Sequence, residues 1–584
     1  MEFKTSAAQP PLSQDRSSAA TELTGVPLSG TSPKSILLCT LNARYHHSSF
    51  GLRYLFANLK ELQPQAQILE FTISQNTKEI VERVLETGAR IVGFGVYIWN
   101  TAQTCEVVSM LKRVKPELII VLGGPEVSYE TETQALCQLA DYTIKGEADF
   151  LFHQFCSQVI TENFLPRVKW ISGELPDISK IASAYPYYSD EDIRHRVIYV
   201  EASRGCPYKC EYCLSSLDKS VRNFNLDAFL ADIELLIQRG ARSFKFIDRT
   251  FNLSQAISSR ILQFFLDRME LGLFLHFEMV PDRLPEELRV LIRKFPKGSL
   301  QFEIGIQTWN PEIAKLVSRR QDYAKIVENF NFLKSDSGVH THADLIVGLP
   351  GEDIASFARG FDAVAELGAD EIQVGILKRL KGTPIIRHDQ EWGMVYQEHS
   401  PFQILQTKVM DFSTLQKMDR FSRYWDHFAN SGNFIQTMKL LQTPGSGPGT
   451  PESGQFEMDS LFWKFFAFCK FLGARHRQTH AIALLNLVES AWIYLTENLR
   501  VNPARVREAL VQDYTGSQKR DIPRFLRDPA ETSAAAQSRA KHSLHRTAQT
   551  ASAASPLAGK STPQRQKRHL QNPAKPETPE ASHV

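Results

Sequence analysis

The chain has little cysteine for its length, with eight such residues among 584. That is too few for a disulfide scaffold, and the N-terminus lacks the apolar core of a secretory signal, so we expect a reducing compartment. No apolar run is long enough to cross a bilayer, so we expect a cytoplasmic protein without a membrane partner. The net charge is only +2, which gives no reason to expect a nucleic-acid partner.

Three of the cysteines lie close together. Cys206, Cys210 and Cys213 have the spacing C-x3-C-x2-C and directly follow the apolar run 197–202, which predicts a strand. Cysteine thiolates in runs of this kind hold iron–sulfur clusters. A [4Fe–4S] cluster with three protein ligands keeps one iron open to a small molecule, and an open position is typical of catalytic metal centres. The other five cysteines lie in apolar stretches and are expected to be buried: Cys39, Cys105, Cys137, Cys156 and Cys469.

Two other interpretations of the cysteine stretch stay open at this point. A closed zinc site needs a fourth ligand, for which His195 is the nearest candidate. A disulfide is the second alternative, and the absence of any sign of export argues against it.

Residues 34–163 alternate predicted strands with predicted helices. The apolar runs fall at 35–40, 67–71, 91–97, 118–122 and 142–145. Such alternation predicts a doubly wound, Rossmann-like parallel sheet, whose ligands bind beyond the carboxyl ends of the strands. Glycines there allow a ligand to approach the backbone closely. The candidate residues at these ends are Gly93, Gly95, Gly123, Gly124, Glu126, Gly146 and Glu147.

Residues 197–385 repeat the alternation six times. The predicted strands are 197–202, 243–248, 274–278, 300–306, 340–347 and 370–376. Six βα units predict a partial (β/α)6 barrel with its chemistry at the carboxyl ends of the strands. His340, His342 and Asp344 alternate and therefore share one face, which either lines a substrate cavity or forms a polar layer inside the barrel.

The remaining segments connect or flank these two domains. Residues 1–33 and 529–584 have the composition of disordered ends, and 164–196 is expected to be a connector. Residues 400–525 carry apolar side chains at helical spacing and predict a helical domain that could cap the mouth of the barrel.

The cysteine spacing, with Tyr212 before the last cysteine, resembles the radical SAM superfamily. That resemblance implies a [4Fe–4S] cluster whose open iron binds S-adenosylmethionine and cleaves it to a 5′-deoxyadenosyl radical. It also implies cofactor contacts at the later strand ends. The family's Gly-Gly-Glu is replaced here by Ile247-Asp248-Arg249-Thr250. The other matches are Glu303 and Gln307 in the fourth-strand motif, and Ile346 and Gly348 in the fifth-strand motif that packs against adenine. Glu303 could instead be a paired interior carboxylate.

The first domain resembles the cobalamin-binding domain that precedes many radical SAM cores. The stretches LGGPEVS and DYTIKGEADF carry this likeness. The Asp-x-His-x-x-Gly motif that ligates cobalt in many such domains is absent. His46 and His47 lie in the first loop, but we expect them to line the loop or face solvent, which leaves cobalamin without a histidine ligand from this domain.

Together these resemblances imply an enzyme that uses the cluster, S-adenosylmethionine and cobalamin to modify an unactivated carbon of a small molecule. Methyl transfer is the outcome they favour, with flavodoxin or ferredoxin as the electron donor. Two alternatives stay open. One is a radical SAM enzyme with a vestigial cobalamin domain that performs a rearrangement or oxidation. The other is a non-enzymatic cobalamin or iron–sulfur sensor.

Overall fold

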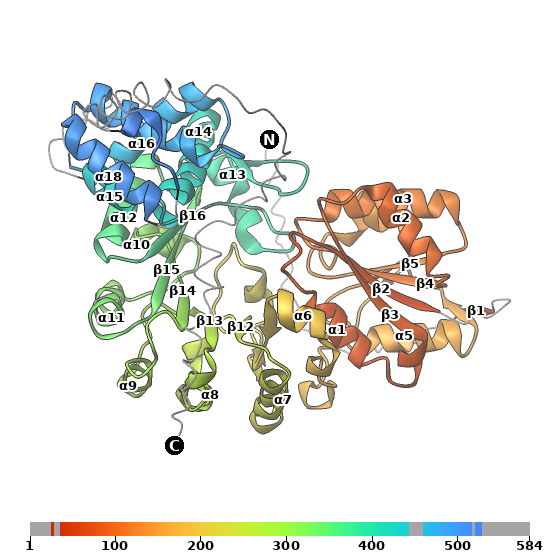
Figure 1. The fold of residues 1–584 in the computed structure, drawn as a ribbon. Helices are drawn as coiled ribbons and strands as arrows, with labels where there is room; N and C mark the ends of the chain where they lie inside the picture. The colour runs from red at the N-terminus through yellow and green to blue at the C-terminus, as the bar shows by residue number, and fades with distance from the viewer. Residues whose placement is uncertain (1–24, 28–34, 443–458, 517–519, 528–584) are drawn as a thin grey trace, which may run out of the picture. The chain divides into compact units, whose positions relative to one another are not determined.

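The computed structural model describes residues 25–27, 35–442, 459–516 and 520–527 (Figure 1). They form two compact units that divide between Tyr187 and Tyr188, with residues 46–48 counted in the second unit. The predicted disordered segments 1–33 and 529–584 lie outside the described residues, apart from 25–27.

The first unit is built on a six-stranded parallel sheet with the order β3-β2-β4-β5-β6-β8. Its strands are β2 (Ile36–Asn42), β3 (Ala66–Thr72), β4 (Ile91–Gly95), β5 (Ile119–Gly123), β6 (Tyr142–Ile144) and β8 (Trp170–Ile171). The chain passes from β2 to β3 on one side and then returns to β4 on the other. This reversal is the switch point at which doubly wound sheets bind ligands.

Helices cover both faces of this sheet (Figure 1). Alternate residues of each strand point to opposite faces, so each face has its own apolar core. One core joins the strands to α2 (Thr77–Glu86), α3 (Thr101–Val114) and α4 (Ala135–Leu139). The other joins them to α1 (Phe50–Ala57) and α5 (Leu151–Ile160). The predicted doubly wound architecture is therefore confirmed.

Two expectations about the flanks of the first unit are wrong. Residues 25–27 form β1 (Gly25–Pro27), which pairs antiparallel with β7 (Phe164–Pro166), instead of being disordered. Most of the expected connector 164–196 also belongs to this unit, because β8 adds to the sheet edge and the division falls after Tyr187. The three strands β1, β7 and β8 are too short to produce a recognisable alternation of apolar residues.

The second unit contains the predicted six-stranded parallel sheet, in the order β16-β15-β14-β13-β12-β9. The strands are β9 (Ile198–Val200), β12 (Ser243–Phe246), β13 (Phe274–Met279), β14 (Leu300–Gln307), β15 (His340–Val347) and β16 (Glu371–Ile376). Its helices are α7 (Leu226–Gln238), α8 (Gln255–Leu266), α9 (Glu286–Ile292), α10 (Pro311–Leu316), α11 (Tyr323–Asp336) and α12 (Ile354–Glu366).

Alternation along the barrel strands separates an apolar face from a polar one. Buried Phe244, Phe246, Phe277 and Phe302 share the apolar face, where the rings of Phe246 and Phe277 lie 4.4 Å apart. The opposite face carries charged and polar side chains: Lys245, His276, Glu278, Glu303, His342 and Asp344. Parallel register places Glu278 beside Glu303 and Glu303 beside His342, so the ionisable groups meet.

A helical region follows the barrel within the same unit, as predicted. It comprises α14 (Phe412–Trp425), α15 (Ile435–Gln442), α16 (Leu461–His476), α17 (Leu484–Ile493) and α18 (Pro503–Thr515). A small hairpin of β17 (Val395–Tyr396) and β18 (Ile404–Gln406) precedes it. Aromatic rings of α14 and α16 pack on Phe361 of α12, so this region covers one edge of the barrel.

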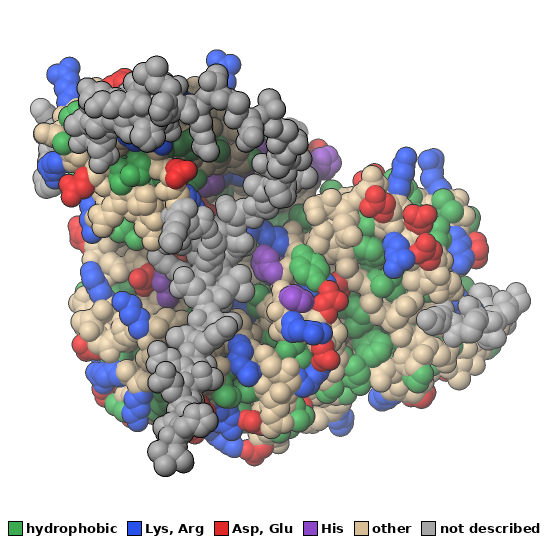
Figure 2. All heavy atoms as spheres, viewed as in Figure 1, with side chains coloured by type: hydrophobic (Ala, Val, Ile, Leu, Met, Phe, Trp, Pro, Cys, Tyr) green, Lys and Arg blue, Asp and Glu red, His purple; other side chains and the backbone are tan. Residues whose placement is uncertain are grey.

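The surface shows no field of a single sign on the face drawn in Figure 2, where acidic and basic side chains are interspersed on each unit. Among the described residues no helix combines the length and apolar character that a membrane span requires.

Candidate active site

Six of the residues predicted to bind cofactors in the barrel line one cavity of about 220 Å³ at the carboxyl ends of its strands. They are Cys206, Cys210, Tyr212, Cys213, Glu303 and Gln307. The lining contains no histidine and no fourth cysteine. The three thiols are thus brought to one place, together with side chains from later strands.

The loop that carries the cysteines is held from three sides. Asp248, at the end of β12, is buried and accepts hydrogen bonds from the backbone of Ala202 and from the hydroxyl of Ser203 at 2.6 Å. The Cys206 N–H donates to Asp218 at 2.9 Å. Glu211 accepts from the ring of His388 at 2.9 Å. Asp248 therefore fixes the start of the loop, and it is not among the residues that line the cavity.

Burial raises the pKa of Asp248 to about 6, although the hydrogen bonds from Ser203 and Ala202 act in the opposite direction. Burial also raises the pKa of the Cys206 thiol, and the neighbouring Cys213 and Cys210 raise it further. The mutual effect of the three sulfurs reflects their proximity.

Arg319 is a member of this site that sequence reasoning missed. Its guanidinium donates to Cys210 Sγ at 3.5 Å and to the Tyr212 hydroxyl at 3.4 Å, and it also bonds the carbonyl of Gly305. Burial would lower the pKa of Arg319, but Tyr212 and Cys210 raise it. A fixed positive charge therefore stands beside one of the predicted ligands. No local motif marks this arginine, because it follows α10 and meets the cysteine loop only through the fold.

Two carboxyl groups in the cavity are driven to opposite protonation states. Burial alone would raise the pKa of Glu303, but a 2.9 Å hydrogen bond from His276 and the charge of Lys245 at 3.5 Å lower it below its usual range. Burial raises the pKa of Asp344 well above its usual value, and the charges of Glu303 and Glu278 raise it further. Glu303 is thus a paired carboxylate, as the alternative interpretation held, and it also lines the cavity.

Asp344 separates from the two histidines with which it alternates on β15. Asp344 lines the cavity, and its buried Oδ1 has no hydrogen-bond partner among the described residues. His340 and His342 donate instead to the two oxygens of buried Glu371, at 2.8 and 2.6 Å. Both predictions for this face of β15 therefore hold in part. The two histidines belong to a polar layer inside the barrel, and Asp344, further along the strand, lines the cavity.

Ile346 and Gly348 lie outside the cavity lining. Gly348 has φ +89°, and a Cβ there would lie 2.7 Å from the side chain of Ile404 in β18. Close packing of the hairpin accounts for this glycine without reference to adenine.

The predicted cobalamin-binding residues of the first unit occupy different positions. Gly95 and Gly123 end β4 and β5, whereas Gly93 lies inside β4 and packs against the ring of Phe152. Gly124 has φ +106°, and any Cβ would collide with the Val96 carbonyl at 2.6 Å. Gly93 is therefore part of the apolar core, whereas Gly95, Gly123 and Gly124 lie at the carboxyl ends of the strands.

The remaining candidates follow β5 and β6. Glu126 is buried, and Glu147 is half-buried three residues beyond the end of β6. Ser128 joins the two strand ends, because its hydroxyl donates to Gly124 O at 2.8 Å and accepts from Gly146 N at 3.0 Å.

Asn100 holds the switch point of the sheet and was not predicted. Its side-chain amide is fully buried and donates to Leu41 O at 3.0 Å and Gly95 O at 3.1 Å, and its oxygen accepts from Tyr97 N at 2.8 Å. An asparagine before a helix is too common for the sequence to single it out. His47 lies within the second unit, 2.6 Å from the Tyr199 hydroxyl.

Comparison with known families follows the division seen in the fold. Residues 36–154 match the B12 binding domain, and residues 200–363 match the radical SAM superfamily. The chain therefore contains a B12-binding domain followed by a radical SAM domain. Residues 390–572 match a protein family of unknown function, DUF4080. The expected cofactors, a [4Fe–4S] cluster, S-adenosylmethionine and cobalamin, are confirmed as those of these two domains.

Several named proteins resemble this chain in sequence. It is 22% identical over 363 residues to an uncharacterised methyltransferase of Pyrococcus horikoshii, covering 57% of this chain and 76% of the relative. It is 28% identical over 198 residues to ribosomal protein uS12 methylthiotransferase RimO of Pelobacter propionicus, covering 32% and 43%. It is 22% identical over 334 residues to 2-(S-pantetheinyl)-carbapenam-3-carboxylate methyltransferase of Streptantibioticus cattleyicolor, covering 49% and 46%. The chain thus spans less than half the length of the last two.

Among solved structures, the radical S-adenosylmethionine methyltransferase TsrM of Kitasatospora setae, with cobalamin and a [4Fe–4S] cluster bound, has a TM-score of 0.51 at 16% identity. The match covers 63% of this chain and 76% of TsrM. A second TsrM structure, with tryptophan and a SAM analogue, also has a TM-score of 0.51, at 14% identity, and covers 76% and 95%. These matches support the fold.

The donor set of the cavity fits a four-iron cluster better than a zinc ion. All eight cysteines are free thiols, which argues against the disulfide. Among the described residues no three His, Cys, Asp or Glu side chains converge on a position for one ion. Zinc ligands lie about 2.3 Å from the metal, so the ligands of one zinc ion must lie close to one another. In a cluster, each thiolate binds a different iron. His195, the candidate fourth ligand, is exposed on α6 (Asp190–His195) and is absent from the cavity lining.

Proposed function

We propose that this chain is a radical SAM enzyme that uses a [4Fe–4S] cluster, S-adenosylmethionine and cobalamin to methylate an unactivated carbon of a small molecule. The observation that carries the proposal is the cavity at the barrel strand ends, where three thiols meet the half-buried Arg319 and no fourth thiol or imidazole. Relatives named as methyltransferases support the choice of methyl transfer.

The side chains around the cavity have distinct tasks in this proposal. Cys206, Cys210 and Cys213 would hold the cluster, and Arg319 would bind and orient the carboxylate of S-adenosylmethionine, since a guanidinium recognises carboxylates through paired hydrogen bonds. When bound, the cluster supplies one electron to S-adenosylmethionine, and cobalamin supplies the methyl group.

The two carboxyl groups would contribute through their opposite charge states. Asp344, kept neutral by burial, can donate a hydrogen bond to a ligand oxygen, whereas Glu303, kept ionised by His276 and Lys245, can only accept. Such a pair distinguishes a donor from an acceptor on the bound ligand. The polar side chains inside the barrel would therefore select between ligands as well as fill the interior.

Anaerobic reconstitution tests the proposal. The reconstituted protein is expected to bind four irons per chain, produce 5′-deoxyadenosine with a low-potential reductant or reduced flavodoxin, and show corrinoid absorbance. The variant Cys210→Ala is expected to abolish 5′-deoxyadenosine formation and retain the corrinoid, because Cys210 lies in the other unit. Mössbauer or anomalous scattering data that place zinc in the loop, or a fourth protein ligand on the cluster, would contradict the proposal.

The same measurements separate the alternatives. A sensor would hold a cluster without cleaving S-adenosylmethionine. An enzyme with a vestigial first domain would cleave it without retaining a corrinoid.

A further inference from the structure

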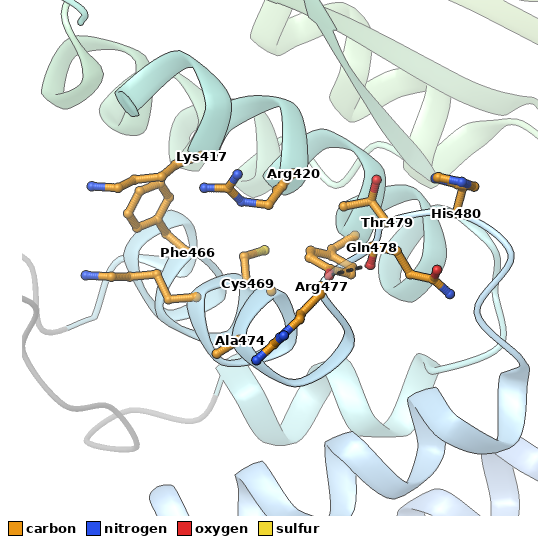
Figure 3. Close-up of a pocket in the computed structure, with 12 residues that line it drawn as sticks. Lys417, Arg420, Phe466, Cys469, Ala474, Arg477, Gln478, Thr479 and His480 are labelled. Atoms are coloured by element: carbon orange, nitrogen blue, oxygen red, sulfur yellow. Dashed lines mark hydrogen bonds between the residues drawn. The ribbon is translucent and has the colours of Figure 1, made fainter. Parts of the chain in front are cut away.

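A second cavity lies in the helical region, away from the cysteine-lined site. It has a volume of about 640 Å³ and lies between α14, α16 and the segment that follows α16 (Figure 3). It shares no lining residue with the cysteine-lined cavity, and the proposed function makes no use of it.

The lining of this cavity is strongly basic. Lys417 and Arg420 come from α14, Lys470 from α16, and Arg477 and His480 from the segment after it. No acidic side chain is among the lining residues. Arg420 and Arg477 form no ion pair with any acidic group in the part of the chain that the structure describes. Like charges gathered in this way repel one another, and a bound anion would relieve the repulsion.

Hydrogen bonds connect the backbone of the segment after α16 to α14. The Tyr424 hydroxyl donates to Gln478 O at 3.0 Å, and the ring of His427 donates to Thr479 O at 3.0 Å. The stem of Arg420 lies over Gly473 of α16, where its Cδ is 3.7 Å from the position of a Cβ. The segment after α16 is thereby tied to α14, so the two arginines face a cavity that forms without a ligand.

We propose that this cavity binds a small polyanion that carries a diphosphate or triphosphate group. Guanidinium groups bind phosphate oxygens in pairs, and several cations around one cavity match a ligand with several negative charges better than a single carboxylate. The volume of the cavity lies in the range of small-molecule sites. The helical region would then recognise a phosphorylated compound at a place separate from the predicted S-adenosylmethionine site.

Calorimetric titration of the full-length protein at about 0.15 M salt tests this site. Sodium tripolyphosphate is the main probe, because a nucleotide could also enter the cavity predicted to hold an adenosyl group. Tripolyphosphate and pyrophosphate are expected to bind. The double variant Arg420→Gln/Arg477→Gln is expected to lower the affinity at least about tenfold, since two charge-assisted contacts are removed. Arg505→Gln, at an exposed position of α18 outside the cavity, is the matched control and is expected to bind like the wild type.

Three results would overturn the proposal. One is the absence of oligophosphate binding to the wild-type protein, or equal binding by the double variant. Another is equal affinity for citrate, which would remove the phosphate preference. The third is tighter binding of single-stranded RNA than of any oligophosphate, lost in the double variant, which would assign the cavity to a nucleic acid. If the double variant fails to fold, the single variant Arg477→Gln at an exposed position replaces it, with a severalfold loss of affinity expected.

Discussion

At the residue scale, Glu211 shows how the cysteine loop is kept in place. This carboxylate lies between Cys210 and Tyr212 and is almost fully buried. It accepts from Arg387 Nε at 2.7 Å and from His388 Nε2 at 2.9 Å, and its backbone carbonyl accepts from Ile385 N at 3.0 Å. The backbone between the second and third cysteines is therefore anchored to a segment more than 170 residues later in the chain.

Replacing this anchor should loosen the metal site. We predict that Glu211→Ala lowers the free energy of unfolding by about 1–3 kcal/mol, because it leaves the buried ring of His388 without its acceptor and removes the ion pair with the exposed Arg387. Iron and sulfide content after reconstitution should fall with it. Denaturant unfolding and metal analysis measure the two effects, with Glu287→Ala, at an exposed position of α9, as the control. Full iron content in Glu211→Ala would show that the anchor does not position the cysteines.

At the element scale, the carboxyl ends of β14 and β15 are joined by one side-chain contact. The Thr308 hydroxyl donates to Glu352 Oε1 at 2.7 Å, while Oε2 is buried without a partner among the described residues. Burial raises the pKa of Glu352 from 4.5 to about 7, with a further contribution from the charge of Asp353. The native state therefore favours the protonated acid.

This shift predicts a specific dependence of stability on pH. The unfolded chain loses the Glu352 proton near pH 4.5 while the native protein keeps it to about pH 7, so the stabilisation is complete below pH 4.5 and is lost as pH rises to 7. The loss amounts to about 3 kcal/mol. Glu352→Gln should flatten this part of the profile, measured by urea unfolding at several pH values. The raised pKa of Asp248 gives a pH dependence of stability with the same sign up to about pH 6. This contribution should remain in the Glu352→Gln variant. An unchanged slope between pH 6 and 7 would contradict the prediction.

The side chain of Asn100 stabilises the switch point of the first sheet through buried hydrogen bonds. Asn100→Ala removes the donors to Leu41 O and Gly95 O and the acceptor for Tyr97 N, all of them buried. We predict a loss of about 2–3 kcal/mol in unfolding free energy, together with a lower corrinoid content of the purified protein. Urea unfolding and corrinoid absorbance provide the readouts. Retention of the full corrinoid content would show that corrinoid binding at the switch point does not depend on Asn100.

At the scale of the whole molecule, the helical region and the barrel share one apolar core. The ring of Phe421 in α14 lies 5.3 Å from that of Phe361 in α12 and 4.8 Å from that of Phe462 in α16. The backbone N–H of Phe462 also donates to Asp362 at 2.8 Å. The two parts of the second unit should therefore unfold together.

The variant Phe421→Ala tests this coupling. We predict a loss of about 3–5 kcal/mol from the cavity that it leaves. Hydrogen exchange should increase in α12 and β16 of the barrel as well as in α14 and α16, and should stay unchanged in residues 35–187. Faster exchange confined to the helical region would show that the barrel and the helical region are energetically independent.

Much of the architecture followed from local sequence patterns. The runs at 91–97 and 340–347 are apolar or strictly alternating, and they appear as β4 and β15 with nearly the predicted ends. The short strands β1, β7 and β8 escaped notice because two or three residues carry no periodicity.

The sequence by itself determined the two parallel sheets and the three clustered thiols, because both depend on neighbours along the chain. Only the tertiary structure decided which side chains meet them. No local motif marks Arg319, Glu211 or Asn100 in the sequence. Asp248 accepts hydrogen bonds that fix the backbone of the cysteine loop, and Gly93 packs in the core of the first sheet. Their roles depend on contacts between segments far apart in the chain, and such contacts leave no local pattern because only folding brings the partners together.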